Sequence, residues 1–106
     1  YPDSEFVDDA YAKIDIINDR LAAKEIEIAR YYQFKQQWIS AINRYNKILE
    51  DYDTSVYTEE ALHRLVEIYY SLGLNEEAKR YASTLGFNFP DSDWYIKSYE
   101  LVKDLS

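Results

Sequence analysis

The chain has 106 residues, 47% of them hydrophobic, and its 12 basic and 20 acidic residues give a formal net charge of −8. This length suits one small domain with its own core, and the negative charge disfavours nucleic acid and anionic lipid as partners. Two glycines and two prolines are too few for the many tight turns of a β-sandwich or barrel, so we expect an all-α protein.

Cysteine is absent, which excludes disulfides, thiolate catalysis and cysteine-based zinc sites. The sequence contains neither an 18-residue apolar run nor a charged-then-apolar leader, so we expect no membrane span and no export signal within it. Twelve residues are tyrosines. Tyrosine suits the seams between packed helices, and an aromatic binding groove is the alternative interpretation.

The first predicted element is one long helix over about residues 5–35, a stretch without glycine or proline. Apolar residues recur in it at steps of three, four and seven, as in a helical stripe. They are Phe6, Ala10, Ile14, Ile17, Leu21, Ile28 and Tyr32. Asn18 and Asp19 are weak helix formers, so a bend there is the alternative to a straight helix.

Two shorter helices are predicted next, over about residues 38–52 and 56–72. The apolar face of the second helix carries Trp38, Ala41, Tyr45, Ile48 and Tyr52, and that of the third carries Ala61, Leu62, Leu65, Ile68, Tyr69 and Leu72. Gly73 follows the third helix, as a C-terminal glycine should.

A fourth helix is expected to be capped by Asn75 and to end near Gly86. The fifth follows Pro90. It is predicted to turn Trp94, Tyr95, Tyr99 and Val102 inward and Lys97, Glu100, Lys103 and Asp104 outward.

One short phrase recurs along the chain, as YPDSEF at 1–6, YDTSVY at 52–57 and FPDSDWY at 89–95. An aromatic ring can dock on a finished helical hairpin, proline cannot continue a helix, and Asp or Ser can cap the next one. A segment that ends one helix and begins the next, repeated along the chain, indicates repeated helical units.

The repeat is supported by an offset of 37 residues, which pairs Tyr32 with Tyr69 and Ala41 with Ala78. Antiparallel helix pairs of about 34 residues, with a small residue in the second helix, are typical of tetratricopeptide arrays. Small residues there allow close approach of the paired helices. Glu25 departs from the pattern, which has tryptophan at that position, and Asp53 replaces the closing proline.

We therefore predict a single tetratricopeptide-like domain over 1–106, a right-handed stack of antiparallel helix pairs and a fragment of an α-solenoid. It has about five helices, the first one long. Residues 1–21 would end a preceding repeat, 22–55 and 56–91 would form two repeats, and 92–106 would form a C-terminal capping helix.

His63 is the only histidine, and Glu59 and Glu67 lie one helical turn to either side of it. A metal site is conceivable there, but a solvated helix face with ion pairs to Arg64 is favoured, because there is no HExxH motif and no second histidine. The pairs Asp8-Asp9, Glu59-Glu60 and Glu76-Glu77 fit first helical turns, with a patch for a basic partner as the alternative.

No nucleophile–histidine order and no glycine-rich phosphate loop is present. We therefore predict a non-enzyme with no catalytic residues, no metal and no cofactor.

The segments INDRLAAKE (17–25), EIARYY (27–32) and AINRYNKILEDY (41–52) resemble the BamD (ComL/YfiO) family of outer-membrane protein assembly lipoproteins, and the similarity covers nearly the whole chain. The resemblance implies an all-helical subunit on the periplasmic side of the Gram-negative outer membrane, held there by an N-terminal lipid. It also implies docking on the POTRA domains of BamA, with other lipoproteins of the machinery and unfolded outer-membrane proteins as further candidate partners. Family members hold five repeats, of which this chain would supply roughly the last three, without the lipidated cysteine and the first, substrate-linked repeats.

Arg44 has no carboxylate three or four residues away, and on a helical wheel it flanks the buried stripe. Its stem can lie on apolar surface while the guanidinium reaches outward. The resemblance implies that this arginine lies at the POTRA contact. We predict a partner-binding set of Arg44, Asn43, Gln37, Ser40 and Asp51.

Two alternatives stand beside this prediction. Arg44 can pair with a neighbouring helix of its own chain. The whole chain can also be a generic tetratricopeptide peptide-binding or adaptor module.

Overall fold

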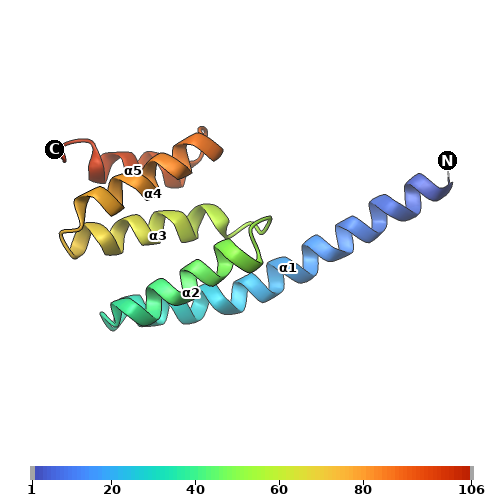
Figure 1. The fold of residues 1–106 in the computed structure, drawn as a ribbon. Helices are drawn as coiled ribbons and strands as arrows, with labels where there is room; N and C mark the ends of the chain where they lie inside the picture. Colours follow the sequence, from blue (N-terminus) through green and yellow to red (C-terminus); the bar gives the residue numbers. More distant parts are fainter. Residues whose placement is uncertain (1, 106) are drawn as a thin grey trace.

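The computed structural model describes residues 2–105, with side-chain surroundings from residue 16 onward, and over that range it is helical with short turns (Figure 1). The helices are α1 (Pro2–Phe34), α2 (Trp38–Asp51), α3 (Thr58–Ser71), α4 (Asn75–Asn88) and α5 (Asp93–Val102). Helices α1 and α2 form one antiparallel pair, α3 and α4 form a second, and α5 packs on both helices of the second pair. The predicted all-α, tetratricopeptide-like stack is confirmed.

Helix α1 is continuous, without an interruption at Asn18, and its N-terminal half extends beyond the other helices (Figure 1). Its core-facing residues are Ala22, Ile26 and Ala29. The predicted stripe is wrong in this part, since Ile17 and Leu21 are 55% and 41% exposed. The reason is that α2 sets the buried face, which runs through Ala22, Ile26 and Ala29 and leaves Ile17 and Leu21 outside it. The predicted positions Phe6, Ala10 and Ile14, and the pair Asp8-Asp9, lie outside the described side chains.

The larger buried cluster joins α1, α2 and α3. It consists of Ala22, Ile26, Ala29, Ala41, Tyr45, Ile48, Ala61, Leu65 and Ile68. A smaller cluster of Val66, Ala78 and Ala82 joins α3 to α4 and receives Leu101 and Val102 from α5 or its end. Ala41 and Ala78 are both fully buried, as the close approach of paired helices requires.

Helix α3 is covered on several sides, because α2, α4 and α5 all pack against it. The predicted positions Ala61, Leu62, Leu65 and Ile68 are buried, but Leu72 is 42% exposed. Helix α3 also buries residues that the single predicted stripe did not include, namely Thr58, Glu60, His63 and Val66.

The turns confirm some sequence signals and correct others. Gly73 follows α3 with φ +77°, the left-handed conformation expected after a helix. Asn75 is the first residue of α4 rather than its cap, because Leu74 holds the cap position without a side-chain hydrogen bond. Helix α4 also runs through Gly86, where a Cβ atom would stand 2.4 Å from the Tyr95 ring. Glycine therefore serves close packing of α5 here and does not end the helix.

Ser92 caps α5, since its hydroxyl accepts hydrogen bonds from the backbone N–H groups of Trp94 and Tyr95. This is the predicted role of the aromatic-Pro-Asp-Ser phrase. The predicted inward face of α5 is partly wrong, because Tyr99 is 51% exposed while Ser98 is fully buried. The aromatic residues led to a predicted face that includes Tyr99, whereas the face that contacts α3 includes its neighbour Ser98.

Candidate partner-binding face and buried polar network

The predicted partner-binding residues lie along one flank of α2, beside its buried stripe. Asn43, Gln37 and Asp51 are exposed, whereas Ser40 and Arg44 are half-buried. Positions 37, 40, 44, 47 and 51 are separated by three or four residues, so their side chains leave the helix on the same side. We call this set, with Asn43 next to it, the α2 flank.

Arg44 is paired within the chain. Its Nη1 group donates a hydrogen bond of 3.0 Å to Glu25 Oε2 on α1, and Lys47 Nζ lies 3.6 Å from Glu25 Oε1. In the isolated chain, Arg44 therefore forms the salt bridge to a neighbouring helix that was the alternative prediction from the sequence. The Arg44 side chain nevertheless stays 38% exposed, so it remains accessible to another protein.

The tip of the α1/α2 hairpin exposes large apolar side chains next to the α2 flank. Phe34 is 82% exposed and Ile39 77% exposed. Between them Gln36 adopts φ 60°, a left-handed conformation that is uncommon for a residue other than glycine. A shallow hollow of about 360 Å³ lies beside this tip, lined by Gln37, Trp38, Ile39 and Ser40.

A network of charged and polar side chains connects α1 to α3. Arg30 Nε donates to Glu60 Oε2 at 2.8 Å, and its Nη2 group donates to Glu60 Oε1. Arg64 donates from Nε to Glu60 at 3.1 Å and from Nη1 to Glu67 at 2.9 Å. Gln33 donates to Glu67 at 3.2 Å and accepts from the hydroxyl of buried Tyr45 at 2.7 Å.

The network changes the acidity of its members. Burial alone would raise the pKa of Glu67, but hydrogen bonds from His63 and Arg64 outweigh it and lower this pKa to about 2. Glu60 behaves alike, because Arg30 and Arg64 overcome its burial and hold its pKa below the usual value. Burial raises the pKa of the Tyr45 hydroxyl. Both carboxylates are thus ionised in the folded chain at neutral pH.

His63 is buried between α3 and α5, so the predicted solvated face is wrong for this residue. Its Nδ1 atom lies 2.7 Å from Ser98 Oγ, and its Nε2 atom lies 3.4 Å from Glu67 Oε2. The Trp94 ring packs on it with a centroid distance of 5.4 Å. Because Ser98 has no exposed surface, the Ser98–His63–Glu67 arrangement ties α5 to α3 and leaves no room for a substrate at the hydroxyl. Among the described residues, no group of His, Asp and Glu side chains is placed to hold a metal ion.

Two hollows bear on the alternative interpretation of the aromatic residues, a binding groove. One of about 530 Å³ lies at the end of α1 and is lined by Arg30, Gln33, Phe34, Gln36, Trp38 and Arg64. Its two arginines already bind Glu60 and Glu67, so their charge is largely neutralised. Tyrosine also fills a seam as expected, since Tyr69 on α3 stacks on Tyr81 of α4 at 5.4 Å.

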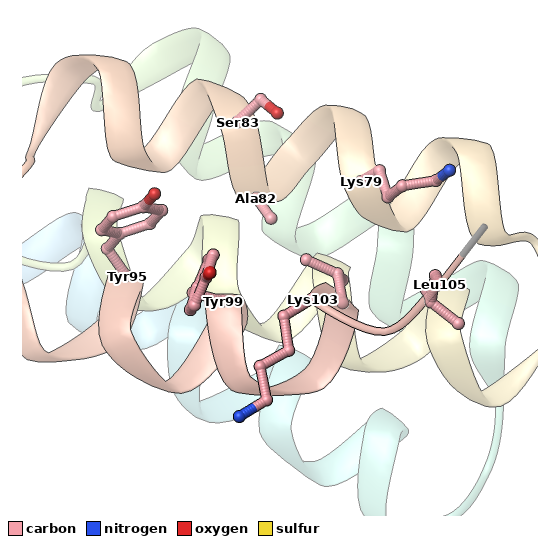
Figure 2. A pocket seen from close by; sticks show the side chains of 8 residues that line it. Lys79, Ala82, Ser83, Tyr95, Tyr99, Lys103 and Leu105 are labelled. Carbon is pink, nitrogen blue, oxygen red and sulfur yellow. The ribbon is translucent and has the colours of Figure 1, made fainter.

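The other hollow, of about 310 Å³, lies between α4 and α5 (Figure 2). Ala82, Tyr95 and Tyr99 contribute to its walls. Lys79 and Lys103 stand at its edge, and each is paired with a glutamate of its own helix, Glu76 or Glu100. This hollow therefore presents apolar surface with little unpaired charge.

Sequence reasoning missed the roles of two glutamates that the fold uses. Glu25 was noted only as a departure from the repeat pattern, and that departure was the available signal. Glu60 was grouped with Glu59 as an acidic residue of a first turn, yet Glu60 is 4% exposed. Its spacing to Arg64 and Glu67 marked a charged row on α3, but its partner Arg30 is 30 residues away.

Within the part of the chain that the structure describes, no helix combines the length and the apolar character needed to cross a bilayer. The sequence model of the YfiO family, described as an outer membrane lipoprotein, matches residues 1–85.

Two curated relatives are outer membrane protein assembly factors named BamD. The one from Rickettsia prowazekii is 46% identical over 104 residues, covering 98% of this chain and 41% of the relative. The one from Caulobacter vibrioides is 48% identical over 104 residues, covering 98% of this chain and 34% of the relative. A BamD from Neisseria meningitidis is 33% identical over 94% of this chain.

The chain thus spans well under half the length of the relatives it matches. The family match nevertheless extends over both helix pairs, up to the last turn of α4. On this evidence the chain belongs to the YfiO family of outer membrane lipoproteins.

Proposed function

We propose that this chain is a non-catalytic scaffold segment of an outer-membrane protein assembly factor. The support is its family and its BamD relatives, which are named outer membrane protein assembly factors. In this role the segment lies on the periplasmic side of the outer membrane, and a lipid anchor outside these residues holds it there. Its task is to bind folded components of the assembly machinery.

The proposed partner is the POTRA region of a BamA-type barrel protein, and the proposed contact is the α2 flank with Arg44 at its centre. One observation carries this choice. Arg44 is 38% exposed, and a single one of its N–H groups is engaged by a described side chain. Its Nε and Nη2 edge is therefore available to form two parallel hydrogen bonds with a carboxylate of the partner.

The peptide-binding alternative is less well supported. An array that grips a terminal carboxylate needs convergent, unpaired basic side chains in its groove. In the 530 Å³ hollow at the end of α1, both arginines are instead bound to Glu60 and Glu67. On the α2 flank, Arg44 engages Glu25 through Nη1 and keeps its Nε and Nη2 edge clear of the described side chains.

The test is to replace Arg44 by leucine and to measure binding to the purified POTRA domains by calorimetry. We expect Arg44→Leu to weaken binding by about 1–3 kcal/mol, the range for a hydrogen bond to a charged group. Helicity and the melting midpoint should change little, since Lys47, whose Nζ lies 3.6 Å from Glu25 Oε1, remains in this variant and a partly exposed ion pair contributes about 1 kcal/mol or less to folding.

Arg80→Leu is the matched control. Arg80 is 66% exposed on α4 and pairs with Glu77 of the same helix, well apart in sequence from the α2 flank. This variant should bind like the parent. Unchanged binding by Arg44→Leu, or equal losses in both variants, would remove the α2 flank from the interface.

A further inference from the structure

We propose that Glu25 is a positioning residue, which holds Arg44 ready for the partner; this inference rests on the proposed docking of the α2 flank. Glu25 lies on α1, and both of its carboxylate oxygens face α2. Its Oε2 accepts the 3.0 Å hydrogen bond from Arg44, and its Oε1 lies 3.6 Å from Lys47 Nζ. One carboxylate thus holds two cations that are one helical turn apart.

The surroundings of Glu25 show that this arrangement is built into the α1/α2 seam. The Glu25 side chain is only 14% exposed, whereas Arg44 and Lys47 are 38% and 46% exposed. A carboxylate at such a seam loses most of its hydration, and it is tolerated when cations compensate it. The tetratricopeptide pattern has tryptophan at this position, which would fill the seam but carries no negative charge to form an ion pair with a cation.

Glu25 fixes the place of the guanidinium before a partner arrives. Without this carboxylate, Arg44 and Lys47 would repel each other, and the long arginine side chain would sample several rotamers. Binding would then have to immobilise it, which lowers affinity. Pre-formed orientation removes part of that cost.

Glu25 does not block the arginine, because it engages Nη1 alone among the described contacts. The opposite Nε and Nη2 edge stays free for a second carboxylate, in the two-point geometry that arginine favours. The Glu25–Arg44–Lys47 cluster has a net charge of +1 on a chain of net charge −8. It therefore favours an acidic site on the partner.

The experiment compares two single variants, Glu25→Gln and Glu27→Gln. Glu27 lies on the exposed side of α1, so its variant is a charge-matched control. Binding of each variant to the purified POTRA domains is measured in the parent and in the Arg44→Leu background. We expect Glu25→Gln to weaken binding about three- to tenfold in the parent, the effect of freeing one side chain. Glu27→Gln should change binding less than about twofold, and Glu25→Gln should cause no further loss once Arg44 is absent.

A second readout follows the side chain itself in the unbound protein. The ¹⁵N relaxation of the Arg44 Nε group should show greater mobility in Glu25→Gln than in the parent or in Glu27→Gln. Unchanged or tighter binding by Glu25→Gln would overturn the positioning role, and so would an equal loss in the Arg44→Leu background. If Arg44→Leu binds normally, the proposed docking of the α2 flank is itself wrong. If Arg44→Leu binds weakly and Glu25→Gln binds normally, the docking proposal stands and Glu25 has no part in it.

Discussion

The sequence suggests that Glu60, like its neighbour Glu59, is a surface acid of a first helical turn. In the structure Glu60 and Glu67 instead hold helices together through hydrogen bonds. Each is hydrogen-bonded to arginine, and the side chains of Arg30 and Gln33 reach them from α1. Removing one partner from a network of this kind leaves a half-buried charge without compensation, which costs more than the network contributes as a whole. At the residue scale, the α1–α3 contact therefore depends on Glu60 and Glu67 both being ionised.

We expect acid to destabilise the fold between about pH 4.5 and about pH 2. The pKa of Glu67 falls from 4.5 to about 2 on folding, so in this window the unfolded chain binds more protons than the native one. The stability from Glu67 is fully present above its unfolded pKa and is lost as the pH falls through its folded pKa. Glu60 shifts in the same direction.

The measurement is the melting midpoint of the parent and of Glu67→Gln across that range. The variant should be less stable at neutral pH and should lose less stability on acidification, because one of the two shifted carboxylates is gone. Glu76→Gln is the control, since Glu76 is 85% exposed, and it should reproduce the slope of the parent. An identical slope for Glu67→Gln would show that Glu67 does not carry the acid sensitivity.

At the scale of helices, the fully buried alanines set the distance between partners. Ala78 has no exposed surface and lies in the smaller buried cluster with Val66 and Ala82. Ala78→Leu should overpack the α3/α4 seam and cost about 1–3 kcal/mol of unfolding free energy. Urea unfolding checks this, with Ser83→Leu on the exposed side of α4 as the control. A parent-like midpoint for Ala78→Leu would contradict the proposed repeat register.

The spacing of apolar residues and the residues that end or cap helices predicted the five helices well. The stripe of α2 and the roles of Gly73 and Ser92 followed from local rules, because they depend on residues within one or two turns. The buried face of α1 and that of α5 did not. Each of these helices carries apolar residues around much of its surface, and the neighbouring helix decides which of them are covered.

The candidate site was less accessible to sequence reasoning than the fold. Arg44 stands out in the sequence because no carboxylate lies three or four residues away and because the family resemblance points to it, but its partner Glu25 is 19 residues away. Likewise His63 meets Ser98 across 35 residues. Such pairs arise when helices are placed side by side, and no spacing rule within a helix reports them.

At the scale of the whole molecule, α5 packs on both α3 and α4, and we propose that it acts as a capping helix. Its Ser98 and Trp94 contact His63 of α3, and Leu101 and Val102 reach the smaller buried cluster. In repeat arrays each unit depends on its neighbour, and the terminal unit needs a polar outer surface. Lys97, Glu100 and Lys103 provide it here, since all three are exposed.

Truncation after Pro90 should therefore expose the α3/α4 pair and leave His63 without Ser98. We expect a lower melting midpoint, stronger binding of a hydrophobic dye, and association at concentrations where the parent is monodisperse. Light scattering and thermal melting measure these changes. A truncated chain as soluble and as stable as the parent would show that α5 is not a cap.

The polar network between α1 and α3 also has a mechanical consequence. These helices are joined chiefly by long side chains, whereas α1 with α2 and α3 with α4 are in extensive close contact. Apolar seams are stiff because close packing resists any change of spacing. Side chains such as arginine and glutamine can instead tilt and keep their hydrogen bonds. The two hairpins are therefore joined by a stiff apolar seam between α2 and α3 and by an adjustable polar contact between α1 and α3, so a change in the angle between them would pivot about the α2/α3 seam.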